Sequence, residues 1–251
     1  MQRSTDIPYT EWMDRILALW RGYLTSIRGY VELAEQTPDR HRMQELFRLL
    51  HARIWDIEQM LDNLEIHLSI LRSHITFDIR PVDIGAVVED VIRRFRMLPS
   101  PTARTIAYTP LLEPATWIGD EKKLRIIVQN LLNNAIRLTP ANEPVGVRMA
   151  YHAPGTLHTG RVPERLRVQG VFLLTIEDRG PGIPEELQEQ VFAPYFQIPD
   201  REYTPHQGLG IGLTVARTLT EALGGVIWLE RRTGGGSVFY VALPEKSKYG
   251  E

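Results

Sequence analysis

The first 75 residues of the chain contain apolar residues at the spacing of a helix. Between residues 11 and 36 they recur at alternating intervals of three and four, which places them along one face of a helix. Thr37, Pro38 and Asp39 interrupt the run, because proline cannot continue a helix and aspartate can start the next one. The spacing resumes over residues 40–75, so the pattern predicts two long helices joined by a short turn. The apolar positions are Met13, Ile16, Trp20, Tyr23, Ile27, Tyr30 and Ala34, then Met43, Phe47, Leu50, Ile54, Ile57, Leu61, Leu64, Leu68 and Leu71.

A hairpin of two such helices cannot cover both of its own apolar stripes. Two hairpins packed against each other would cover them as a four-helix bundle. We therefore expect residues 1–79 to form a dimerisation domain and the chain to form a homodimer.

The pattern changes near Arg80, where shorter units with mixed periodicity begin. Residues 170–178 are nearly all apolar, which indicates a strand at the centre of a sheet. Residues 152–169 form a polar excursion longer than a tight turn needs, and a lid, a partner contact and a simple decoration remain open for it. The predicted fold class is α + α/β, a helical hairpin followed by an α/β sandwich over residues 80–251. Its other expected elements are a strand-to-helix unit over residues 82–95, helices over 120–138 and 213–223, and strands over 105–108, 145–151, 226–230 and 237–243.

The composition limits the classes of function. With 43% hydrophobic and 24% charged residues and a net charge of −2, the chain is an ordinary globular protein without an electrostatic reason to bind nucleic acid. It has no cysteine, which excludes disulfides, iron–sulfur clusters and thiolate zinc sites. No apolar run approaches the ~18 residues of a membrane helix, and the N-terminus lacks a signal-peptide core. We expect a cytoplasmic protein with no membrane partner; a piece of a membrane receptor is the alternative, although Met1 suggests a natural start.

Two asparagines on the expected helix over residues 120–138 are candidate metal and phosphate ligands. Asn130 and Asn134 lie one turn apart, so both amides face the same way. An amide oxygen suits Mg²⁺, which prefers oxygen ligands and shares its shell with phosphates and water. The apolar neighbours of these amides make simple solvation a poorer explanation. Arg137, almost one turn further on, could reach a phosphate.

Two glycine-rich turns follow. The carboxylate of Asp178, placed after the central strand and before two glycines, could accept a hydrogen bond from an exocyclic amine such as that of adenine. The second turn leads into the helix starting near Leu213, where backbone N–H groups bind phosphate without side chains. It is neither a P-loop, because no Gly-Lys-Ser/Thr follows, nor a Rossmann fingerprint, because the spacing differs. The turn residues that we assign to a nucleotide pocket are Asp178, Gly180, Gly182, Ile183, Gly208, Gly210, Ile211, Gly212 and Leu213.

An aromatic patch at Phe192, Tyr195 and Phe196 separates the two turns. Core packing and the anchoring of a short lid over residues 198–207 explain it about equally well. On the second interpretation we count Phe196 among the nucleotide-binding residues.

In this order the motifs resemble the N, G1, F and G2 boxes of the GHKL ATPases, and specifically the catalytic domain of sensor histidine kinases. The helical hairpin resembles the dimerisation and phosphotransfer domain of that family. The resemblance implies ATP and Mg²⁺ as cofactors, with Asn134 on the metal, Asp178 on adenine and the glycines of the second turn around the phosphates. It also implies a homodimer or a heterodimer with another kinase, and a response regulator or other signalling protein as partner. Stretches outside the boxes that also fit are residues 120–124, 224–230 and 236–237.

The first helix departs from the family. Its members carry a phosphoacceptor histidine followed by an acidic residue, and the same frame here holds Ala18 and Leu19. The family's hydroxyl position linked to phosphatase activity is Gly22, and its proline position is Tyr23. Alanine has no nucleophile, so autophosphorylation at Ala18 is chemically impossible.

Several functions remain open. The first is an ATP-binding signalling protein of the two-component type that acts as a pseudokinase or partner-directed regulator. The second is an active protein-histidine kinase whose acceptor lies on a partner or at an unusual site. A serine kinase of the anti-sigma type and an Hsp90- or gyrase-like ATPase share the boxes but lack such a hairpin, and a structural bundle with a vestigial pocket is the last alternative. The histidines that could replace the acceptor are His41, His51, His67 and His74.

Overall fold

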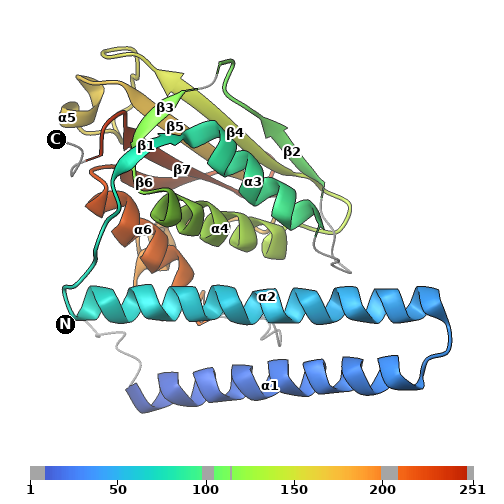
Figure 1. Ribbon diagram of the computed structural model, residues 1–251. Coiled ribbons are helices and arrows are strands. Elements are labelled where there is room, and N and C mark those ends of the chain that lie inside the picture. The colour runs from blue at the N-terminus through green and yellow to red at the C-terminus, as the bar shows by residue number, and fades with distance from the viewer. Residues whose placement is uncertain (1–8, 98–104, 114, 199–208, 248–251) are drawn as a thin grey trace.

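Two long helices form the base of the molecule. They are α1 (Tyr9–Gln36) and α2 (Arg40–Leu71), which run antiparallel beneath the other elements (Figure 1). Asp39 caps α2, where its side chain accepts a hydrogen bond from the backbone N–H of His41 at 2.8 Å. The predicted hairpin and its turn are confirmed. The computed structural model describes residues 9–97, 105–113, 115–198 and 209–247, and no helix in these ranges combines the length and apolar character that a membrane crossing requires.

A mixed five-stranded sheet lies at the top of the molecule in the order β2-β4-β5-β7-β6. The first two strands pair in parallel, and the other neighbours are antiparallel. The strand that was predicted to be central is β5, the middle strand of the sheet. Its side chains are mostly buried on both faces, which explains why nearly all of them are apolar. The strands are β2 (Ile106–Thr109), β4 (Val145–His152), β5 (Val171–Glu177), β6 (Val226–Arg231) and β7 (Ser237–Pro244).

Three helices fill the space between this sheet and the hairpin (Figure 1). Each buries one apolar face against alternate residues of the strands, which forms the main hydrophobic core. The molecule therefore has three layers, and the helical layer contacts both the sheet and α2. The helices are α3 (Ile84–Met97), α4 (Glu121–Leu138) and α6 (Gly212–Ala222).

A two-stranded antiparallel ribbon joins the hairpin to the sheet layer. It consists of β1 (Arg80–Asp83) and β3 (Thr116–Gly119). The strand β3 was not predicted from the sequence, because it depends on its pairing with β1 more than 30 positions earlier in the chain. Trp117 anchors the ribbon: its ring is fully buried, and its Nε1 donates a hydrogen bond to the carbonyl oxygen of Pro244 at 2.9 Å.

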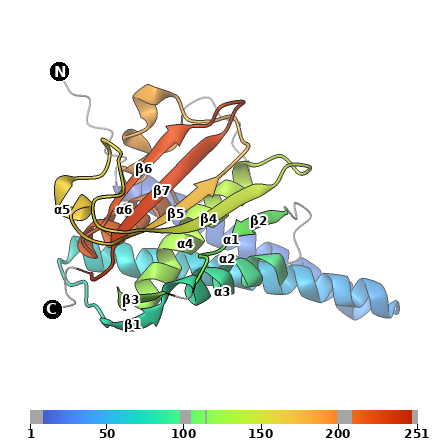
Figure 2. The same ribbon diagram turned by 90° about the horizontal axis from the view of Figure 1, so that it is seen from above.

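The polar excursion over residues 152–169 packs on the outer face of the sheet (Figure 2). Leu157, Val162 and Leu166, the last from the short helix α5 (Glu164–Arg167), form a small core with Trp228. Trp228 lies on the face opposite the main core, since its strand neighbours Ile227 and Leu229 belong to that core. Residues 152–169 therefore cover part of the outer face of the sheet.

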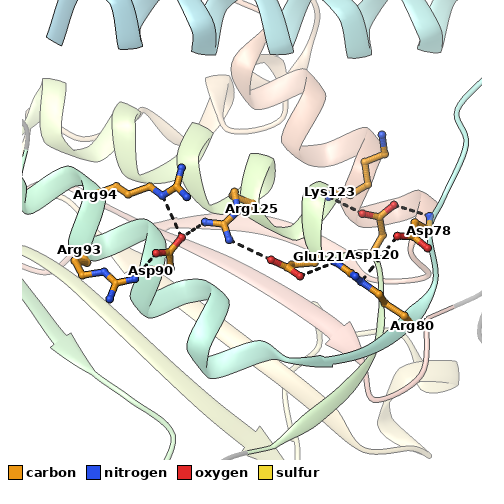
Figure 3. Close-up of polar contacts among 9 residues, drawn as sticks. All are labelled: Asp78, Arg80, Asp90, Arg93, Arg94, Asp120, Glu121, Lys123 and Arg125. Atoms are coloured by element: carbon orange, nitrogen blue, oxygen red, sulfur yellow. Dashed lines mark hydrogen bonds and ion pairs between the residues drawn. The ribbon is translucent and has the colours of Figure 1, made fainter. Parts of the chain in front are cut away.

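Charged side chains connect α3, α4 and the linker that follows the hairpin with one another (Figure 3). Asp120 accepts hydrogen bonds from the backbone N–H groups of Asp78 at 2.8 Å and Lys123 at 2.9 Å, so one carboxylate caps α4 and holds the linker. Asp90 of α3 accepts hydrogen bonds from Arg125 of α4 and from two arginines of its own helix. These contacts fix α3 against α4.

Candidate nucleotide-binding site

Asp178 lies directly after β5 and is 1% exposed. Its Oδ1 accepts hydrogen bonds from the backbone N–H groups of Gly180 at 2.9 Å and Ser237 at 3.2 Å. Because Ser237 begins the neighbouring strand β7, two backbone segments hold the carboxylate in one orientation. A buried carboxylate fixed in this way can recognise a specific hydrogen-bond donor on a ligand.

The glycines of the first turn allow close backbone approach. A Cβ at Gly180 would lie 2.8 Å from the carbonyl oxygen of Leu138, at the end of α4. Gly182 has a φ of +77° and faces Gly236. A Cβ added at Gly236 would lie 2.1 Å from the carbonyl oxygen of Asp178. Side chains at these positions would separate the turn from α4 and from the β6–β7 connection.

The two α4 amides differ in their surroundings. The Oδ1 atom of Asn134 accepts a hydrogen bond from Arg137 at 3.3 Å, whereas its Nδ2 is buried and bonds to none of the described residues. Asn130 instead forms a reciprocal amide pair with Asn63 of α2: Asn63 Nδ2 donates to Asn130 Oδ1 at 2.8 Å, and Asn130 Nδ2 donates to Asn63 Oδ1 at 2.7 Å. Of these two asparagines, Asn134 alone has a buried polar atom, Nδ2, that bonds to none of the described residues.

The second glycine turn meets α4 and the aromatic patch. A Cβ at Gly212 would lie 2.8 Å from Asn130 Oδ1, and one at Gly210 would lie 3.0 Å from the carbonyl carbon of Tyr195. Gly212 begins α6, whose N-terminus receives no side-chain cap from the described residues. The hydroxyl of Thr214, in the first turn of α6, is buried and has no hydrogen-bond partner among them. This helix end can therefore bind an anion through backbone N–H groups and one hydroxyl.

Core packing of the aromatic patch is confirmed for Phe192, whereas the anchoring of a lid stays a prediction because residues 199–207 lie outside the described residues. Phe192 packs edge-on against Phe239, with ring centroids 6.4 Å apart, so it belongs to the core. Phe196 is half-buried against the same core. Tyr195 turns away from the core and contacts the helical hairpin.

Residues 119–247 match the family model of the histidine kinase-, DNA gyrase B- and HSP90-like ATPases. This span contains both asparagines of α4 and both glycine turns. The chain belongs to this ATPase family.

The similar curated proteins are sensor kinases. The adaptive-response sensory kinase SasA of Synechocystis sp. (strain ATCC 27184 / PCC 6803 / Kazusa) is 30% identical over 204 residues, which cover 81% of this chain and 47% of the relative. The sensor histidine kinase AruS of Pseudomonas aeruginosa is 40% identical over 125 residues, which cover 50% of this chain and 11% of the relative. The ATPase chain thus spans about half or less of the length of these relatives.

Solved histidine kinases share the fold. The mycobacterial sensor histidine kinase MprB is 26% identical with a TM-score of 0.53, over 68% of this chain and 99% of that chain. The histidine kinase AdeS of Acinetobacter baumannii is 21% identical with a TM-score of 0.54, over 90% of this chain and 96% of that chain. A likeness over 90% of the chain reaches into the helical hairpin as well as the ATPase unit.

The structure brings most of the predicted pocket residues of this GHKL ATPase together. Both turns and α4 meet at Gly180, Gly212 and Asn130, while the exposed Arg137 lies at the rim beside Asn134. The remaining predicted residues that are described, Gly182, Ile183, Phe196, Gly210, Ile211 and Leu213, are buried or half-buried around these contacts. Gly208 and residues 199–207 of the expected lid lie outside the described residues.

Four residues in or beside the candidate site were not predicted from the sequence. Thr139 accepts a hydrogen bond from the backbone N–H of Arg179 at 3.1 Å, which ties the first glycine turn to the end of α4. Thr214 could have been found as the polar residue just after the second turn. Asn63, which pairs with Asn130, and His67, whose Nε2 lies 2.7 Å from the Tyr195 hydroxyl, could not have been found, because nothing near them in sequence indicates contact with the ATPase unit.

Proposed function

We propose that this chain is an ATP-binding, histidine-kinase-like signal transduction protein of a two-component pathway that does not phosphorylate itself at the usual position. The convergence of the buried Asp178, the amide of Asn134 on α4 and the uncapped start of α6 carries the first half of the proposal. The absence of a nucleophile at Ala18 carries the second half.

The residues fit a magnesium nucleotide. Asp178 would bind the exocyclic amine of adenine, and Asn134 would bind Mg²⁺ through its amide oxygen, with Asn130 and Arg137 on the phosphate side. The backbone N–H groups at the start of α6 would bind the phosphates. The bound Mg²⁺ would neutralise phosphate charge, and these side chains would orient the nucleotide and exclude water around it.

The position of Ala18 supports the proposal that the chain lacks the usual phosphoacceptor. Ala18 lies on the exposed side of α1, where an acceptor would be open to a nucleotide or a partner, and its methyl group offers no lone pair. Of the four histidines considered as substitutes, His41, His51 and His74 are exposed, whereas His67 is 2% exposed. The alternative, transfer to a histidine elsewhere, would therefore use one of the exposed three or a partner's histidine.

A second copy of the hairpin, or that of another kinase, would cover the apolar side chains that α1 and α2 leave exposed. In a four-helix bundle these residues would be buried between the two hairpins. A response regulator or another signalling protein would then receive the output of the assembled bundle. The exposed apolar side chains include Leu17, Leu24, Leu33, Phe47, Ile54 and Leu61.

Phosphate incorporation from γ-labelled ATP tests the proposal, after calorimetry has established binding of Mg-ATP. Binding without label on the purified chain is the expected result. Acid-labile label on the chain would favour the alternative kinase, and the absence of any nucleotide binding would refute the proposal.

A further inference from the structure

The helical hairpin contacts the very elements that form the nucleotide site. Trp12 and Ile16 of α1 and Met60 of α2 form a separate buried cluster with Leu209 and Ile211 of the second glycine turn. All five side chains are 9% exposed or less. The hairpin is therefore docked on the ATPase unit, and its contact surface includes a motif expected to bind phosphate (Figure 1).

A polar contact crosses the same interface. In the amide pair between Asn63 and Asn130, each side chain donates one N–H to the oxygen of the other, at 2.8 and 2.7 Å. While this pair exists, the amide group of Asn130 is bound to α2. The same amide lies next to Gly212, where α6 begins.

Tyr195 links the second turn to both helices of the hairpin. Its hydroxyl lies 2.7 Å from Nε2 of His67, and its ring centroid lies 5.0 Å from that of Trp12. Its backbone N–H donates to the carbonyl oxygen of Gly210 at 2.9 Å. Tyr195 has a φ of +66°, a strained conformation that persists only while its surroundings hold it.

We infer that the hairpin and the nucleotide compete for these groups, so that nucleotide binding releases the hairpin from the ATPase unit. Recruitment of Asn130 by the ligand removes the partner of Asn63, and movement of Gly210 around the phosphates displaces Tyr195 from His67 and Trp12. The released hairpin exposes Trp12, Ile16 and Met60 to a partner. The inference rests on the proposed function, because it names the regulation of the same site.

The competition is reciprocal. If nucleotide weakens docking by a given factor, docking weakens nucleotide binding by the same factor. Typical couplings between two such sites correspond to about 5- to 150-fold changes in affinity. Output would then follow nucleotide occupancy, without any phosphate transfer.

Thiol labelling of the 251-residue chain measures docking directly. The natural sequence has no cysteine, so Met60→Cys introduces the sole thiol at a position buried by the dock. We expect saturating Mg²⁺ with a non-hydrolysable ATP analogue to raise its labelling rate about 5- to 50-fold. Gln44→Cys, on an exposed position of the same helix, is the control and should react at one rate throughout.

Calorimetry of Asn63→Ala with the same analogue measures the reciprocal effect. This variant should bind about 5- to 10-fold more tightly than the wild type, because Asn130 no longer has to leave a partner. Gln44→Ala should bind like the wild type.

The outcomes separate the two proposals. Nucleotide binding with unchanged Met60→Cys labelling, or with equal or weaker affinity of Asn63→Ala, would overturn the inference and leave the proposed function intact. No binding by either the wild type or Asn63→Ala would overturn both.

Discussion

At the scale of single residues, Asp178 is the group on which the proposed recognition of adenine would depend most directly. Asn at this position would keep one acceptor but replace the other oxygen with an amide donor, which opposes the amine of adenine. We expect Asp178→Asn to weaken binding of Mg-ATP by roughly 1–3 kcal/mol, the scale for a lost buried hydrogen bond. Calorimetry measures the change, and unchanged affinity would remove Asp178 from the site.

His67 adds a pH dependence to the docked hairpin. Burial lowers the pKa of His67 from its ordinary value of 6.5, and its Nδ1 has no hydrogen-bond partner among the described residues. The folded chain thus binds its proton less readily than the unfolded chain does. The contribution of neutral His67 to the free energy of unfolding is fully present above pH 6.5. It decreases as the pH falls below 6.5 towards the lowered pKa of the folded chain.

Urea unfolding at several pH values tests this effect. We expect the free energy of unfolding to fall more steeply between pH 7 and 5 in the wild type than in His67→Gln, which keeps a hydrogen-bonding group but does not titrate. The exposed His51 supplies the control, since His51→Gln should leave the slope unchanged. Equal slopes in the wild type and His67→Gln would contradict the role of His67.

The residues that sequence analysis found and missed differ in how far their partners lie along the chain. Asp178, Gly180 and Gly182 lie within five positions of one another, so the sequence alone shows them as one turn. Asn63 and Asn130 are 67 positions apart, and His67 and Tyr195 are 128 positions apart. Contacts over such separations arise from tertiary packing, which leaves no local pattern.

At the scale of elements, the charged cluster between α3 and α4 contributes to stability in a pH-dependent way. Hydrogen bonds from Arg93 and then Arg125 hold the pKa of Asp90 at about 2 (Figure 3). Because the folded pKa is lowered, the contribution of Asp90 is present above its ordinary value of 3.8 and is lost as the pH falls towards 2. The arginines are partly exposed, so solvent screens the gain.

We expect Asp90→Asn to lower the free energy of unfolding at pH 7 by about 1 kcal/mol, and the deficit to shrink below pH 4. Glu89→Gln alters the adjacent exposed residue and should change it by less than about 0.5 kcal/mol. Chemical denaturation at pH 7 and pH 3 checks both statements. A deficit that persists unchanged at low pH would mean that packing, not charge, explains the loss.

Elements with a strong period were predictable, and so was the short strand β2, but the short strand β3 was not. The helices α1, α2, α4 and α6 and the long strands follow from apolar periodicity and from caps such as Asp39 and Asp120. The ribbon strand β3 has four residues and depends on its pairing with β1. The small core of the 152–169 excursion likewise depends on Trp228, a residue far along the chain.

At the scale of the whole molecule, the hairpin and the ATPase unit were each predictable, but their contact was not. The apolar seam of α1 and α2 indicates only that some surface must cover it. In the structure, Trp12, Ile16 and Met60 are covered by the second glycine turn, while other positions of the two helices stay exposed. The hairpin therefore has one face covered by the ATPase unit and one exposed face, which the proposed second copy would cover.

This exposed surface predicts the oligomeric state. Leu24 of α1 is 59% exposed, and in a bundle of two hairpins it would be buried in both copies. A glutamate there would place a charge in an apolar interface, and the burial of each leucine, about 1.5–3 kcal/mol, would be lost. We expect Leu24→Glu to weaken dimerisation by at least about tenfold in sedimentation experiments. Leu112→Glu, at a fully exposed leucine of the ATPase unit, should sediment like the wild type. A wild-type chain that stays monomeric at every concentration would mean that a different partner covers α1 and α2.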